Sequence, residues 1–68
     1  MDIELRPSAR ETMIARDIDF LEVRAVIEAP EMIETSGGLV AYYGRIAGRD
    51  LRVVALVDTD PLVVLDVR

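Results

Sequence analysis

The chain lacks several residue types on which many functional sites depend. It contains no cysteine, no histidine, no lysine and no tryptophan, and only three of its 68 residues are aromatic. Without cysteine there is no disulfide to staple so short a chain, and without cysteine or histidine the usual zinc sites are excluded. We therefore expect no metal site and no cofactor. Hydrophobic burial and association remain as the sources of stability for a domain of this size.

Long hydrophobic runs are also missing. No apolar stretch approaches the ~18 residues typical of a transmembrane helix. The first residues, Met1-Asp2-Ile3-Glu4, lack the basic start and the apolar core of a signal peptide. The absence of cysteine fits a reducing compartment. We expect a single domain over residues 1–68, located in the cytoplasm and without a membrane contact.

The charge is unevenly distributed over a net value of −5. Residues 1–34 contain nine acids and four arginines, whereas residues 35–68 contain four of each. Sequence-independent binding to nucleic acid depends on cations that neutralise phosphates, so the acidic balance disfavours RNA as a partner. All eight basic residues are arginine, which suits bidentate phosphate or carboxylate contacts. Genomic base composition explains the same bias without any function.

The first half of the chain predicts a short strand and a short helix. Residues 2–6 alternate polar and apolar side chains, as an edge strand does, and Pro7 stops the pattern. Ser8 and Glu11 have the spacing of a capping box. We expect a helix from this point to about Arg16.

A second capping box predicts a second helix. Asp19 and Glu22 repeat the spacing, and Ile18 directly before the cap is placed to pack on Val23 as a hydrophobic staple. Apolar residues at three- and four-residue spacing follow, and Pro30 ends the pattern. We expect this helix to reach about residue 28.

The second half of the chain reads as a sheet. Strands or extended segments are expected over residues 31–35, 39–45, 50–57 and 62–67, separated by turns rich in glycine, aspartate and proline. Helices that precede a run of strands are typical of an α+β domain. The predicted fold is two short N-terminal helices packed on a four- to five-strand, mostly antiparallel sheet.

Two of the predicted strands are apolar almost without interruption, over residues 51–57 and 62–67. A half-exposed strand should alternate, because successive side chains point to opposite faces. Both faces of this sheet therefore need cover, and a chain of this length has little material for two layers. We expect a homodimer or another protein partner, with an interface drawn from the apolar residues Val53, Val54, Leu56, Val63 and Leu65.

A set of short motifs runs through most of the chain. The first half carries Ser8-Ala9, Met13, Arg16-Asp17-Ile18, Val23, Ile27 and Pro30; the second carries Tyr43-Gly44-Arg45, Gly48-Arg49, Leu51 and Val53-Val54. In this pattern the chain resembles a small bacterial family of domains of unknown function that is usually placed with the RelE/ParE-like toxins. The resemblance extends from about residue 5 to residue 68. It implies a two-helix layer on a curved antiparallel sheet.

The resemblance also implies a ribonuclease toxin paired with an antitoxin, and the chain departs from the family at the polar helix face. The family commonly has histidine where this chain has Ser8 and arginine where it has Thr12, while Arg16 matches. Residues four apart are neighbours on a helix, so these three positions share one face. RNA cleavage needs a proton acceptor, a proton donor and cations for the transition state. Arginine, tyrosine and carboxylates remain to supply them.

Five residues are candidates for function, each with a simpler explanation. Arg45, Arg49 and Arg52 surround the hairpin between the two central strands, where they would hold phosphate or RNA, or else pair with surface carboxylates. Arg16 and Tyr43 are the catalytic candidates. An ion pair or a helix-terminus contact would explain Arg16, and packing with a bonded hydroxyl would explain Tyr43.

Two functions remain open at the level of sequence. The first is a non-catalytic binding or self-assembly module, favoured by the acidic charge and the two-sided apolar strands. The alternative is an RNA-cleaving toxin of a toxin–antitoxin pair, favoured by the family resemblance.

Overall fold

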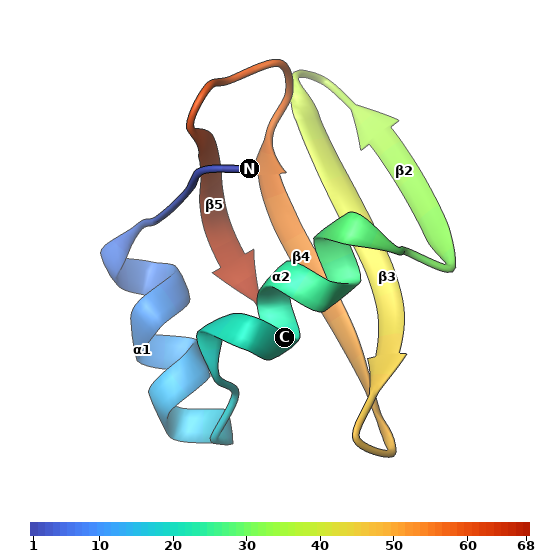
Figure 1. Ribbon diagram of the computed structural model, residues 1–68. Coiled ribbons are helices and arrows are strands. Elements are labelled where there is room, and N and C mark those ends of the chain that lie inside the picture. Colours follow the sequence, from blue (N-terminus) through green and yellow to red (C-terminus); the bar gives the residue numbers. More distant parts are fainter.

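The computed structural model describes residues 1–68 and contains two helices and one five-stranded sheet (Figure 1). The elements are β1 (Ile3–Leu5), α1 (Pro7–Arg16), α2 (Phe20–Glu28), β2 (Met32–Ser36), β3 (Leu39–Ile46), β4 (Arg49–Leu56) and β5 (Leu62–Val67). Across the sheet the strands lie in the order β1-β5-β4-β3-β2, and only β1 and β5 are parallel. The predicted α+β fold is confirmed. Neither helix has the length and apolar character that a membrane crossing requires.

Helix α1 begins differently from the prediction. It starts at Pro7, whose missing N–H would have had no partner in the first turn anyway, and Arg6 at the N-cap makes no side-chain bond. Ser8 lies inside this turn, and its hydroxyl donates a 2.6 Å hydrogen bond to the carbonyl of Leu65 on β5. The predicted capping box at Ser8 is therefore wrong, because the N-cap position is occupied by Arg6 and Ser8 lies within the helix, where its hydroxyl links the helix to the sheet.

Helix α2 begins as predicted. The Asp19 carboxylate accepts a 2.8 Å bond from the amide of Glu22, and the Glu22 carboxylate accepts a 3.0 Å bond from the amide of Asp19. Ile18 and Val23, the predicted staple, both lie in the hydrophobic core. Asp17 adopts the left-handed conformation (φ 55°) at the end of α1. The chain therefore passes from one helix to the next within three residues.

Strands β3 and β4 form the central hairpin. Their two-residue turn, Ala47-Gly48, has positive φ at both positions, which is the backbone of a type I′ turn. Strand β2 pairs with β3 and forms one edge of the sheet, while β1 pairs with β5 and forms the other. The predicted strand limits, including those of β1, agree with the structure within about one residue.

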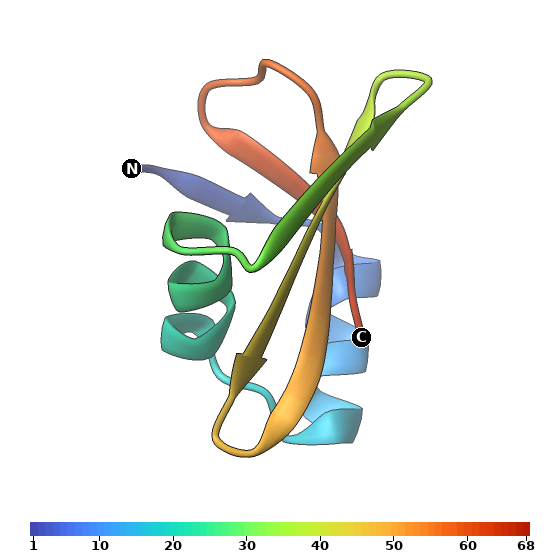
Figure 2. The ribbon, with the colours of Figure 1, turned by 90° about the vertical axis from the view of Figure 1, so that its right-hand side faces the viewer.

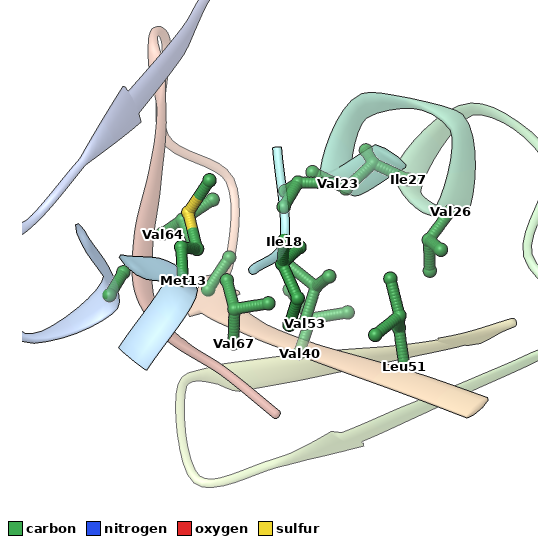
Figure 3. Close-up of a cluster of buried hydrophobic side chains, with 12 residues drawn as sticks. Met13, Ile18, Val23, Val26, Ile27, Val40, Leu51, Val53, Val64 and Val67 are labelled. Atoms are coloured by element: carbon green, nitrogen blue, oxygen red, sulfur yellow. The ribbon is translucent and has the colours of Figure 1, made fainter. Parts of the chain in front are cut away.

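A single hydrophobic core lies between the helices and one face of the sheet. Helix α2 lies across β3 and β4, and α1 lies beside β5; Figure 2 shows α2 on one side of the central hairpin. Apolar side chains from both helices meet those of the three central strands (Figure 3). The core comprises Ala9, Met13, Ile18, Val23, Val26, Ile27, Val40, Leu51, Val53, Ala55, Val64 and Val67.

Gly44 lets α2 approach the sheet closely. A Cβ atom placed on Gly44 would lie 3.2 and 3.3 Å from the two γ-carbons of Val26. These distances are shorter than ordinary van der Waals contacts, so the helix rests directly on the backbone of β3 at this point. This close packing fixes the height of α2 above the sheet.

Candidate binding surface on the open sheet face

The two faces of the central strand have different neighbours. Val53 and Ala55 on β4 are fully buried beneath the helices, whereas Val54 and Leu56 alternate with them and are half-buried. The strand therefore has one face covered by the helices and one face that no part of the chain covers. Val53 has no exposed surface to offer a partner, so its predicted interface role is corrected: the side chain is fully used by the core.

The face that carries Val54 has a shallow hollow of about 150 Å³ at its centre. Ala41 on β3 is only 7% exposed, because its neighbours on the two adjacent strands shield it from solvent. No helix residue contributes to the hollow, so it belongs to the sheet alone. The lining residues are Glu34, Ser36, Leu39, Val40, Ala41, Arg52 and Val54.

Opposite charges stand on opposite sides of this hollow. Glu34 comes from β2, and its carboxylate accepts a 3.1 Å hydrogen bond from the Tyr43 hydroxyl. Arg52 comes from β4, is exposed, and forms no ion pair within the chain. Ala41 and Val54 separate the two charged positions in the sheet register. We call the exposed side of β2, β3 and β4 around the hollow the open sheet face. It is apolar in the middle, with a negative charge on its β2 side and a positive charge on its β4 side.

The three arginines expected near the hairpin do not form one site. Arg45 and Arg52 lie on the open sheet face, as their register partners Asp50 and Tyr43 show. Arg45 is occupied locally, donating 2.9 Å bonds to the Asp50 carboxylate and to the carbonyl of Gly48. Arg52 alone keeps its guanidinium unpaired.

Arg49 points toward the helices instead. Its guanidinium donates hydrogen bonds to the backbone carbonyls of Arg16 (2.6 Å) and Asp17 (2.5 Å) and to the Glu22 carboxylate (3.2 Å). The last carbonyls of a helix lack partners within the helix and carry partial negative charge, so a cation is favoured there. Arg49 is therefore a structural clamp between the hairpin and the two helices.

The two predicted catalytic residues lie on different layers. Arg16 ends α1, and its side chain is exposed, while its carbonyl binds Arg49. Tyr43 lies on the open sheet face and binds Glu34. On α1, the Thr12 hydroxyl donates to the Ser8 carbonyl, as helical threonines often do. The structure therefore does not bring Arg16 and Tyr43 into a common site.

The remaining predicted interface residues lie away from the core. Val54, Leu56, Val63 and Leu65 are all half-buried. Leu65 is the extra residue of a bulge, because Ala55 pairs with Val64 while Val54 pairs with Asp66. The pairing of β4 with β5 is therefore irregular at this point, and the hollow of the open sheet face is lined by residues of β2, β3 and β4 alone.

Residues of the β2–β3 hairpin were missed by the sequence interpretation. Glu34, Ser36 and Leu39 line the hollow, but β2 was too short and too polar to suggest a surface. The pairing register could have indicated these residues. When β2 is paired with β3, Glu34 lies opposite Ala41 and Ser36 lies opposite Leu39. No group of three or more acidic side chains is placed to hold a metal ion.

Comparison with known proteins identifies a family but no close relative. The family model for a domain of unknown function, DUF4258, matches residues 6–67. The search of curated proteins and the search of solved structures found no match. The match includes both helices and all the strands except β1. The chain therefore belongs to the DUF4258 family of domains of unknown function.

Proposed function

We propose that this chain is a non-catalytic, cytoplasmic protein-binding module and that it binds through the open sheet face. One observation carries the proposal: an apolar hollow lies at the centre of a sheet face that no element of the chain covers. Half-buried Val54 and Leu56 and exposed Leu39 surround a small, recessed Ala41. Binding at such a surface is favourable when a side chain of the partner protein fills the hollow, because the apolar lining is then removed from water.

The polar groups on this face favour binding over catalysis. Tyr43 and Glu34 satisfy each other, and Arg45 is paired with Asp50, so these groups hold one another in place. A catalytic site needs a proton acceptor and a proton donor converging on one reacting atom. The polar groups here are instead spread along the rim of an apolar centre, which is the arrangement of a protein interface.

Site-specific photo-crosslinking in growing bacteria tests the proposal. A diazirine-bearing amino acid is placed at Leu39, which is exposed beside the hollow, and in a matched chain at Leu21, which is 69% exposed on α2. We expect a protein adduct from position 39 and none from position 21. If position 39 gave no adduct, or no more adduct than position 21, the result would contradict a binding role for this face.

The alternative is an RNA-cleaving toxin of a toxin–antitoxin pair. The resemblance to RelE/ParE-like toxins supports it, as does Arg52, an unpaired cation whose register partner is the hydroxyl-bearing Tyr43. Induced expression in bacteria tests it directly. Growth arrest with cleaved RNA, abolished by Tyr43→Phe or Arg52→Gln, would establish this function in place of the first; unaffected growth with intact RNA would reject it.

A further inference from the structure

We infer that the partner of the open sheet face is a second copy of this chain, related to the first by a two-fold axis along β3. This inference rests on the proposed function, because it names the occupant of the same surface. It follows from the order of three features across the sheet: the acid Glu34 on β2, the apolar Ala41 on β3 and the cation Arg52 on β4.

A two-fold axis parallel to β3 makes this arrangement self-complementary. Rotation about such an axis lays β2 of one copy over β4 of the other, so Glu34 of each copy faces the Arg52 side of its mate. The two residues are two register positions apart along the strands, since Glu34 is level with Val54 and Arg52 is level with Met32. The long arginine side chain spans that offset. The same residues thereby form two symmetric ion pairs, as an isologous interface requires.

The apolar groups agree with this geometry. The axis brings the two hollows together, with Leu39 of each copy near the hollow of the other. The strands of the two sheets run in nearly the same direction, which is the common aligned packing of two sheets ~10 Å apart. Met32, which is 51% exposed beside Tyr43, is covered by the stem of the opposite Arg52.

The other symmetric arrangement is unfavourable. A two-fold axis perpendicular to the strands would place β2 over β2 and β4 over β4, so that the two Glu34 carboxylates share one side of the interface and the two Arg52 guanidinium groups share the other. Like charges at an interface oppose association. Charge therefore favours the axis parallel to β3 over the axis perpendicular to the strands.

The area of the open sheet face limits the affinity that we expect for the dimer. Three strands of five to eight residues, spaced ~4.8 Å apart and rising ~3.4 Å per residue, offer about 340 Å² per copy. Two copies then bury about 700 Å², below the usual range for stable complexes. We expect a reversible dimer that dissociates on dilution through the micromolar range and weakens with salt.

Charge reversal tests the inference. Glu34→Arg gives a face with two cations, and Arg52→Glu gives a face with two anions. We expect each variant alone to be monomeric by light scattering, with dimerisation at least about tenfold weaker than in the unmodified chain. Mixed in equal amounts they restore both ion pairs, so we expect a one-to-one heterodimer of about twice 7.6 kDa.

Matched controls separate interface charge from net charge and from folding. Glu11→Arg and Arg10→Glu make the same charge changes on exposed positions of α1 that form no ion pair, and should leave dimerisation unchanged. Glu34→Gln keeps an acceptor for the Tyr43 hydroxyl while removing the charge, and should weaken the dimer without loss of folding.

The outcomes distinguish this inference from the proposed function. A chain that stays monomeric at high concentration, or a mixture of the two reversed variants that does not associate, would overturn the two-fold dimer. If the crosslink from Leu39 then yields an adduct with a different protein, the binding module stands and only the second copy is rejected. A crosslinked species of twice the chain mass supports the dimer.

Discussion

The guanidinium of Arg49, at the start of β4, lies 3.2 Å from the carboxylate of Glu22 in the first turn of α2. The same Glu22 carboxylate caps α2, and the same guanidinium binds the last carbonyls of α1. Both side chains are largely shielded from solvent, with exposed fractions of 33% and 17%. One residue of the sheet thus holds the end of one helix and the start of the next.

Replacing Arg49 by methionine should therefore destabilise the fold. The change removes charge-assisted hydrogen bonds to Arg16 and Asp17 while keeping an apolar stem of similar length. We expect a loss of about 1.5–3 kcal/mol in the free energy of unfolding. Urea unfolding followed by circular dichroism measures it. Arg10→Met, at an exposed position that makes no side-chain bond, is the control and should stay within about 0.5 kcal/mol.

Two neighbouring valines on β4 should respond differently to the same substitution. Val53→Asp places a carboxylate in the core, which costs several kcal/mol and exceeds what a domain of this size can sustain. Val54→Asp places it on the open sheet face, where solvent reaches it. We expect the first variant to be unfolded and the second to be folded but monomeric. Circular dichroism and light scattering on both variants report the two results, and equal unfolding would contradict the assignment of faces.

Gly44→Ala should lower stability through a single contact. The added methyl group meets Val26 at 3.2 Å, so α2 must lift slightly from the sheet. We expect a loss of about 1–3 kcal/mol. In the double variant Gly44→Ala, Val26→Ala the clash is absent, so its loss should be smaller than the sum of the two single losses. Additive losses in thermal or urea unfolding would show that the contact is not the cause.

Substitutions at Ser8 in α1 and at Asp19 before α2 should differ in their effect on the free energy of unfolding. Asp19→Ala removes the observed cap of α2 and should cost about 1 kcal/mol, whereas Asp19→Ser should retain most of the stability. Ser8→Ala removes a bond to Leu65 but improves helix propensity in α1, so its net effect should be within about 0.5 kcal/mol. Unfolding midpoints of the three variants give the comparison. A larger loss at Ser8 than at Asp19 would contradict the observed capping.

The sequence predicted those elements whose signals are local. The cap at Asp19 and the tight turn at Gly48 depend on residues close together in the chain, and both are present. The predicted cap at Ser8 is absent because the helix begins at Pro7, so Ser8 lies inside the first turn, and its hydroxyl donates to a carbonyl 57 positions away. Sequence spacing shows a hydroxyl oxygen near an amide, but it does not show where the helix begins or which distant groups the folded chain brings close.

The candidate site was less predictable than the fold. Proximity to one hairpin made Arg45, Arg49 and Arg52 look like a cluster, yet strand alternation sends Arg49 to the opposite side from the other two. The hollow joins Glu34 to Arg52, which are 18 positions apart and come from strands that are not adjacent in the sheet. Their relation depends on pairing register, which no local pattern specifies.

The parallel pairing of β1 with β5 joins Ile3 to Leu62, almost the full length of the chain apart. The other strand pairs are antiparallel hairpin neighbours, which close short loops and form readily. The closing pair carries the largest loop-closure entropy, so it should be the last part of the sheet to assemble. During synthesis on a ribosome, β1 would therefore wait unpaired until β5 emerges, and the amide of Arg6, which binds the carbonyl of Val64, would be protected from hydrogen exchange only after that late step.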